Sequence, residues 1–109
     1  MDPRVTWAVV TMVQRLGRRL SVADLAREVG LSPSRFTRLF RRETGMTPCR
    51  YHLVLRLRRA ETLLAESSLS IREVMTLVGI AHPGHFAREF RRYHGVCPSD
   101  VQRRRLVAR

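Results

Sequence analysis

One segment of this chain occurs twice, and this internal repeat constrains the fold more than any other feature of the sequence. Residues 21–48 are similar to residues 70–98. The offset between the copies is 49 residues up to Gly79 and 50 residues from Phe86 onward, so the second copy carries one extra residue. Two copies of a segment this long rarely arise by chance, and they predict two similar structural units.

The first copy has the pattern of a helix, a tight turn and a second helix. Residues 24–29 predict a short helix, and Gly30 follows it as a residue that enters a left-handed turn without a Cβ clash. Ser32 and Pro33 then form a cap and first-turn pair, because the serine hydroxyl accepts a hydrogen bond and proline has no N–H to lose. The second helix is expected to end at Gly45.

The second helix of this copy has an apolar back and a basic front. Phe36, Leu39 and Phe40 recur at helical spacing and are expected to face inward. The opposite side is polar and suits insertion into a DNA major groove; it carries Ser34, Thr37, Arg38, Arg41 and Arg42. An ordinary helical hairpin with a solvated arginine face is the alternative, and the presence of two copies makes it less favourable.

The remaining segments also predict helices. A helix from Asp2-Pro3 to Gly17 should bury the stripe formed by Val5, Val9, Met12, Val13 and Leu16. A helix from Thr47-Pro48 to about Ser67 has two apolar patches and should pack on two sides; one is Leu53, Leu57, Ala60 and Leu64, the other Tyr51, Val54 and Leu55. Its length of about 27 Å is comparable to one DNA turn of about 34 Å. Ser99 or Asp100 should cap a final helix that runs to about Leu106.

Composition favours a nucleic-acid partner. The formal net charge is +12, and all 21 basic residues other than histidine are arginine. Guanidinium groups suit phosphates and guanine edges, and small arginine-rich helical chains most often bind nucleic acid. No apolar run approaches the roughly 20 residues that span a bilayer, and the N-terminus lacks the features of a secretion signal. We therefore expect a cytoplasmic protein that does not bind membranes.

Three short spacings suggest metal ligands but fall in separate parts of the chain. They are Cys49-x-x-His52, His82-x-x-His85 and His94-x-x-Cys97. Structural zinc needs four ligands that converge, so we expect no metal and no cofactor. The two cysteines are interpreted as small, partly buried residues rather than as a disulfide. The sequence shows no nucleophile elbow, phosphate-binding glycine loop or paired-carboxylate pattern, and we expect no enzyme.

The chain resembles the DNA-binding domain of the AraC/XylS family of bacterial transcription activators from about residue 5 to residue 101. The segments that carry the resemblance are LAREVGLSPSRFTRLFRRETGMTP, the linker pattern Tyr51…Arg56-Leu57…Ala60…Leu63-Leu64, and VGIAHPGHFAREFRRYHGVCPSD. The resemblance implies an all-α fold of about seven helices with two helix-turn-helix subdomains, residues 1–46 and 68–109, joined by a linker helix, residues 47–67. It also implies monomeric binding to two successive major grooves of double-stranded DNA.

The resemblance assigns roles to individual positions. Base edges would be read by Ser34, Thr37 and Arg38 in the first copy and by His85 and Arg88 in the second. Phosphates would be bound by Arg41, Arg42, Arg91 and Arg92. The second copy departs from the family pattern at Met75, Ile80, His82, Pro83 and Gly84. Because Gly84 has no side chain to read a base, we expect the first copy to supply most of the specificity and the second to bind mainly phosphates.

Three functions are compatible with these patterns. The leading one is a sequence-specific transcription regulator, an activator that also contacts RNA polymerase. The alternatives are a basic module that docks on an acidic protein surface and a protein that coats DNA without sequence preference. Many members of the family carry a sensor or dimerisation domain before this one, whereas some act alone, and the sequence is compatible with both arrangements.

Overall fold

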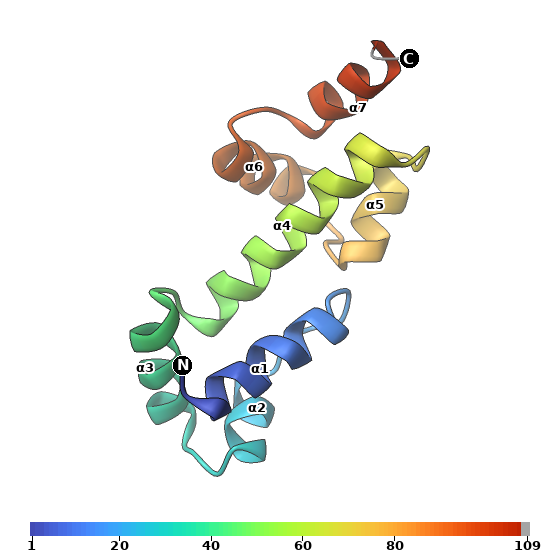
Figure 1. Cartoon of the computed structure of the whole chain (residues 1–109). Helices are drawn as coiled ribbons and strands as arrows, with labels where there is room; N and C mark the ends of the chain where they lie inside the picture. The colour runs from blue at the N-terminus through green and yellow to red at the C-terminus, as the bar shows by residue number, and fades with distance from the viewer. Residues whose placement is uncertain (108–109) are drawn as a thin grey trace. The chain divides into compact units, whose positions relative to one another are not determined.

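The computed structural model describes residues 1–107, and within this range the chain forms seven helices and no strand (Figure 1). The all-α expectation is therefore confirmed. The chain divides into two compact units, unit 1 (Met1–Leu53) and unit 2 (Val54–Arg109). The helices are α1 (Pro3–Gln14), α2 (Val22–Glu28), α3 (Pro33–Thr44), α4 (Pro48–Glu66), α5 (Ile71–Val78), α6 (Pro83–His94) and α7 (Pro98–Val107).

Helix α1 begins where the sequence predicts, but its buried face is narrower than expected. The Asp2 side chain accepts a hydrogen bond from the Arg4 backbone N–H and caps the helix. The buried residues are Val5, Ala8 and Met12, which lie on one face. Val13 was expected in the core, but its side chain is 55% exposed because it projects to a different side of the helix.

The end of α1 also differs from the prediction. Gly17 was expected to stop this helix, but α1 ends at Gln14 and Arg15 is its C-terminal cap. The backbone N–H of Arg15 still bonds to the carbonyl of Thr11, and the residue has a φ of −117°. The chain thus leaves the helix without a left-handed residue, and Gly17 is not needed to end it.

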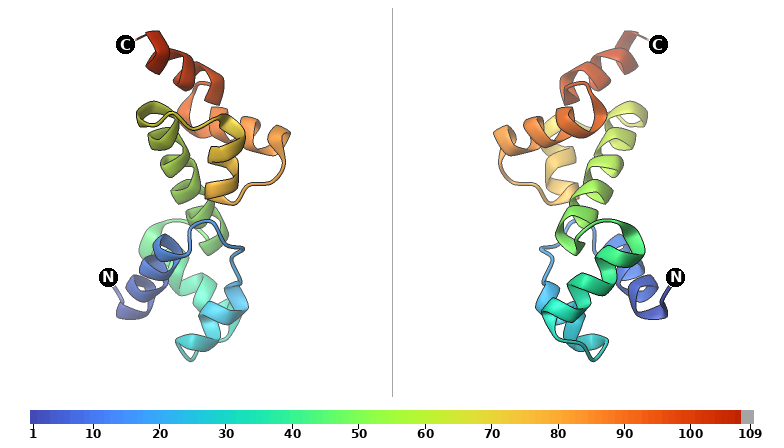
Figure 2. Two further views of the ribbon diagram at one scale, coloured as in Figure 1. Left: turned by 90° about the vertical axis from the view of Figure 1, so that its right-hand side faces the viewer. Right: turned by 90° about the vertical axis from the view of Figure 1, so that its left-hand side faces the viewer.

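The first helix-turn-helix is built as the sequence predicts. Ser21 caps α2 by accepting a hydrogen bond from the Asp24 N–H at 3.2 Å, and α2 begins two residues earlier than expected. Gly30 turns the chain with a φ of +73°, a conformation that costs a glycine little. The Ser32 hydroxyl then accepts a hydrogen bond from the Arg35 N–H and starts α3. Helices α2 and α3 lie side by side in both views of Figure 2.

The core of unit 1 is formed by the apolar back of α3. Phe36, Leu39 and Phe40 are buried as predicted. The ring of Phe40 lies 5.8 Å from that of Phe36 and contacts the edge of Tyr51 at 5.3 Å, measured between ring centroids. Tyr51 belongs to the first turns of α4, so this helix contributes directly to unit 1.

Unit 2 repeats the arrangement with different caps. Ser70 and Glu73 form a reciprocal capping box at the start of α5, and Gly79 follows α5 in the turn before α6. Phe86 and Phe90 are buried with ring centroids 5.6 Å apart. These phenylalanines occupy the positions of Phe36 and Phe40 in unit 1, so the repeat in the sequence is a repeat in packing.

Two further contacts tie the helices of unit 2 together. The Nε2 atom of His94 lies 2.8 Å from the Leu57 carbonyl oxygen, which connects the end of α6 to α4. Helix α7 begins at Pro98, one residue before the predicted cap. Asp100 does not cap from outside the helix; it lies in the first turn, where its carboxylate accepts a hydrogen bond from the Cys97 N–H at 3.1 Å.

Helix α4 is buried on two sides, as its two apolar patches predict. Tyr51 packs on Phe40 in unit 1, whereas Leu57, Ala60 and Leu64 are fully buried in unit 2. Over the part of the chain that the structure describes, neither α4 nor any other helix has the length and apolar character needed to cross a bilayer.

Candidate nucleic-acid interface

The outward face of α3 presents the polar side chains that the sequence predicts as DNA contacts. Ser34, Arg38, Arg41 and Arg42 are exposed, because they lie opposite the buried phenylalanines. Thr37 is half-buried at the edge of this face. The front of α3 is therefore a polar and basic surface held in place by an apolar back.

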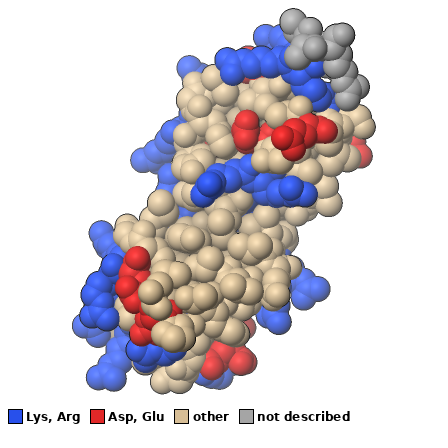
Figure 3. Space-filling view, in the orientation of Figure 1, with Lys and Arg blue, Asp and Glu red and all other residues tan. Residues whose placement is uncertain are grey.

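The guanidinium groups on this face are available for an external partner. Ion pairs of the chain lie elsewhere, at Arg4–Asp2, Arg27–Asp24 and Arg103–Asp100. Among residues 1–107, no carboxylate forms an ion pair with an arginine of the α3 front. Figure 3 shows arginine side chains gathered along the side of unit 1 on which α3 lies. Unpaired guanidinium groups on a protruding helix suit phosphate oxygens and guanine edges.

Helix α6 presents a similar exposed face that has fewer side chains able to form hydrogen bonds. His85, Arg88, Arg91 and Arg92 are all exposed, as predicted. Gly84 is exposed too, and a Cβ built on it would meet nothing within 4 Å. Open space therefore surrounds the position that corresponds to Ser34, so α6 has the same scaffold as α3 but fewer groups that can form hydrogen bonds.

The two recognition helices also begin differently. Ser32 caps α3 through its hydroxyl, whereas His82 at the same place before α6 makes no capping hydrogen bond. The sequence departs from the family pattern at His82, and the missing cap is the structural consequence. Both helices end at a glycine with a positive φ, Gly45 and Gly95.

Arg35 is an exposed residue of α3 that the sequence analysis did not assign to the site. It corresponds to His85 at the repeat offset of 50, and His85 was assigned. The repeat offset is therefore the signal in the sequence that points to Arg35. The exposed basic surface of unit 1 is thus larger than predicted by one arginine.

The metal-like spacings do not form a cluster. No group of three histidine, cysteine, aspartate or glutamate side chains that could hold a metal ion occurs among the described residues. Cys49 is exposed, whereas His52 is only 4% exposed. Both cysteines are free; Cys97 is partly buried as expected, but Cys49 is not.

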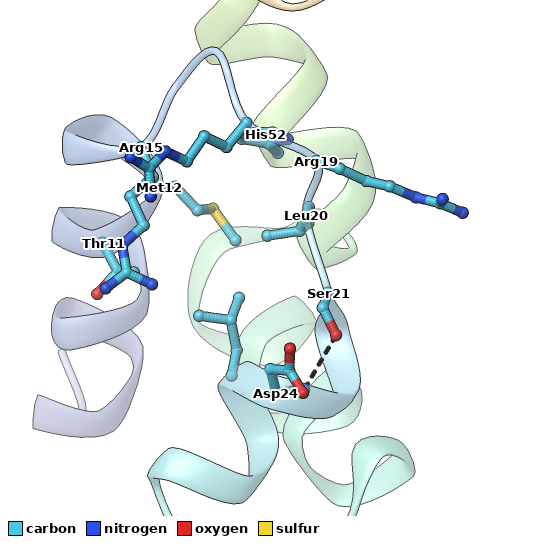
Figure 4. Close-up of a pocket in the computed structure, with 10 residues that line it drawn as sticks. Thr11, Met12, Arg15, Arg19, Leu20, Ser21, Asp24 and His52 are labelled. Carbon is cyan, nitrogen blue, oxygen red and sulfur yellow. Dashed lines mark hydrogen bonds between the residues drawn. The ribbon is translucent and has the colours of Figure 1, made fainter.

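A small cavity of about 140 Å³ lies in unit 1 beside the loop between α1 and α2 (Figure 4). His52 and Asp24 are among its lining residues. Met12 and Leu20 point toward each other across it, and Arg19 is directed away from it. The front of α3 does not line this cavity, and we assign it no ligand.

Two helix-turn-helix motifs with exposed arginine faces define a class of DNA-binding proteins. Residues 25–104 match the family model of a helix-turn-helix domain. A transcriptional regulator with an AraC-type DNA-binding domain from Chromobacterium violaceum has a similar structure, with a TM-score of 0.87 and 34% identity over 95% of this chain and 93% of that one. The chain belongs to the AraC-type helix-turn-helix family and is an AraC-type DNA-binding domain.

Two further relatives bear on function. The DNA-binding domain of AdpA, a global transcriptional factor solved in complex with a target DNA, has a TM-score of 0.88 and 28% identity over 100% of this chain and 97% of that one. The regulator GbdR of Pseudomonas aeruginosa is 36% identical over 91% of this chain. The match covers 27% of GbdR, so the chain corresponds to only part of that regulator's length.

Proposed function

We propose that this domain regulates transcription by reading two short blocks of double-stranded DNA, one through α3 and one through α6. The observation that carries the proposal is the repeated scaffold, in which a buried phenylalanine pair holds an exposed arginine face on each recognition helix. The complex of the similar AdpA domain with a target DNA supports DNA as the partner. The proposed role is binding rather than catalysis.

In the first block, Arg38 is the main base-reading residue. It lies at the centre of the exposed front of α3, and its planar fork can bond to both O6 and N7 of a guanine. Such a contact is worth about 1–3 kcal/mol of discrimination. Ser34 and Thr37 would add hydrogen bonds or contact a thymine methyl group, while Arg41 and Arg42 would bind phosphates and release counterions.

In the second block, binding depends more on phosphates than on bases. His85 and Arg88 are the groups on α6 that we assign to base edges, and Arg91 and Arg92 are assigned to phosphates. The functional parts that we propose are residues 1–46, 47–67 and 68–109. The two similar motifs then occupy successive major grooves, and a single chain suffices for binding.

The setting of this activity follows from the family resemblance. We propose that the domain acts in the cytoplasm beside a promoter, as an activator that contacts RNA polymerase. Transcription from a template that carries the selected site measures this directly. Increased transcript in the presence of the domain supports activation, whereas decreased transcript identifies a repressor.

Selection of bound duplexes from a random DNA pool tests the proposed function. The expected result is two short preferred blocks about 10 bp apart, since adjacent major grooves on one face of DNA repeat at that distance. Binding with equal affinity for all sequences would instead identify a protein that coats DNA. Absence of binding to any duplex would favour the acidic-surface docking module.

A further inference from the structure

A hollow lined by four arginines lies beside the predicted base-reading face of unit 1. Its volume is about 470 Å³, and it is open to solvent. Its walls come from the start of α1, the turn before α3 and one flank of α3 itself. The lining residues are Arg4, Leu31, Arg35, Arg38, Leu39 and Arg42.

Three of these arginines form no close ion pair with a carboxylate, although Arg42 attracts the Asp2 carboxylate over a longer distance. Arg35, Arg38 and Arg42 are exposed, and within the described part of the chain none of them forms an ion pair. Three like charges on one flank of a helix repel one another and raise the local positive potential. An anion in the hollow would relieve this repulsion.

The fourth arginine is held in position by an acid behind it. The Nε and Nη2 atoms of Arg4 donate hydrogen bonds to Asp2 at 3.1 and 2.9 Å. These bonds lower the pKa of the Asp2 carboxyl to about 2, so the carboxylate stays ionised at neutral pH. A guanidinium has five N–H donors, and three therefore remain for a second anion. Asp2 reduces the net charge but fixes the direction in which Arg4 donates.

The floor of the hollow is apolar. Leu39 is 7% exposed, and Leu31 is half-buried. The same leucines offer a surface for the carbon atoms of a sugar. A phosphate linked to sugars fits this combination better than a free inorganic ion.

We propose that this hollow seats a backbone phosphate of the duplex, with Arg35 and Arg4 as its ligands. The inference rests on the proposed function, since it places α3 in a major groove whose phosphate ridge runs along this flank. Arg38 lines both the hollow and the front of the helix. A phosphate held here would therefore fix the register at which Arg38 meets a base edge.

The corresponding positions of unit 2 differ from those that line this arginine hollow. At the repeat offset of 50, His85 stands in place of Arg35 and Glu89 stands in place of Leu39. The open hollow beside α5 has Arg72 as its single arginine, and its other lining residues are Met75, Thr76, Gly79, Ile80, Ala81 and Pro83. The phosphate seat is thus a property of unit 1 and adds to the difference between the two motifs.

The salt dependence of binding to one selected duplex tests the seat. Each phosphate contact contributes about −0.9 to the slope of log K against log salt. The slope therefore becomes less steep by about 0.9 when one contact is removed. We expect Arg35→Gln and Arg4→Gln each to make this slope less steep by about that amount. Arg15→Gln is the matched control, because Arg15 is an exposed arginine at the other end of α1. It should leave the slope as it is.

The outcomes separate this inference from the proposed function. An unchanged salt slope for Arg35→Gln, or an equally reduced slope for Arg15→Gln, would overturn the proposed phosphate seat. The proposed function would still hold if the parent domain shows a sequence preference. A parent domain without sequence preference would overturn the proposed function instead. A slope that becomes less steep only in the Arg35 and Arg4 variants would support the phosphate seat, with or without a sequence preference of the parent domain. Arg35 is exposed, so circular dichroism should show an unchanged fold.

Discussion

Base preference should depend on Arg38 more than on any other side chain. Arg38 has polar neighbours on the front of α3, whereas its counterpart Arg88 has Gly84 and Ala87 beside it. We predict that Arg38→Ala removes the preference at one base pair, a loss of about 1–3 kcal/mol of discrimination. Arg88→Ala should weaken binding with a smaller change in preference.

Selection of bound sequences with each variant measures this difference. Arg59→Ala serves as a control, since Arg59 is an exposed arginine of α4 outside both recognition helices. A larger relaxation of preference in the Arg88 variant than in the Arg38 variant would show that the second motif carries the specificity.

Gly84 is expected to tolerate a side chain. A Cβ at this position would meet nothing within 4 Å, and glycine within a helix costs roughly 0.5–1 kcal/mol relative to alanine. Gly84→Ala should therefore raise the free energy of unfolding by up to about that amount, measured by urea denaturation. Gly95→Ala is the matched contrast: space around it is also open, but its φ is +80°, so the substitution should destabilise the domain.

At the scale of the helix, the two recognition helices differ in their N-terminal caps. The Ser32 hydroxyl accepts the Arg35 N–H at 3.3 Å, whereas His82 makes no such bond. Removal of a serine cap costs about 1 kcal/mol. We predict that Ser32→Ala lowers the free energy of unfolding by about this amount and that His82→Ser raises it by up to the same amount.

Urea denaturation of both variants checks this prediction. Ser34→Ala provides the control, because Ser34 is exposed within the same first turn and does not cap the helix. A cost for Ser34→Ala equal to that of Ser32→Ala would show that the effect does not come from capping, since alanine favours a helix more than serine does.

Helix boundaries could be predicted where local chemistry sets them. Ser32 and Gly45 occupy the cap positions that the sequence suggests. The C-terminal end of α1 and the start of α7 could not be predicted to the residue. Gly17 and Asp100 both fit a boundary by residue type, but α1 ends with Arg15 as its cap and α7 begins at Pro98, because residue type alone does not fix the terminal residue of a helix.

At the scale of the whole molecule, net charge should dominate the salt dependence. A domain with a charge of +12 and two arginine faces is expected to contact about 6–10 phosphates, which predicts a slope of log K against log salt of about −5 to −9. Electrophoretic mobility or anisotropy titrations between 50 and 200 mM salt measure this slope. The affinity should fall by a factor of about 10³–10⁵ over that range. A salt-independent affinity would contradict a binding mode based on phosphates.

Thr37 shows why part of the candidate site needed the structure. Its spacing places it with the polar residues on the side of α3 opposite the phenylalanines. In the structure it is half-buried, because it lies close to the edge of the phenylalanine face. Helical periodicity assigns a side but does not say how far the neighbouring elements extend over it.

The sequence alone determined the repeat, the helical type of each segment and the basic fronts of the recognition helices. Those features depend on caps, turns and periodicities that act over a few residues. Only the tertiary structure decided that Ala8 rather than Val13 is buried in α1 and that Arg4 lies beside Arg35 in one hollow. These outcomes depend on how helices distant in the chain pack together, and no local pattern records that packing.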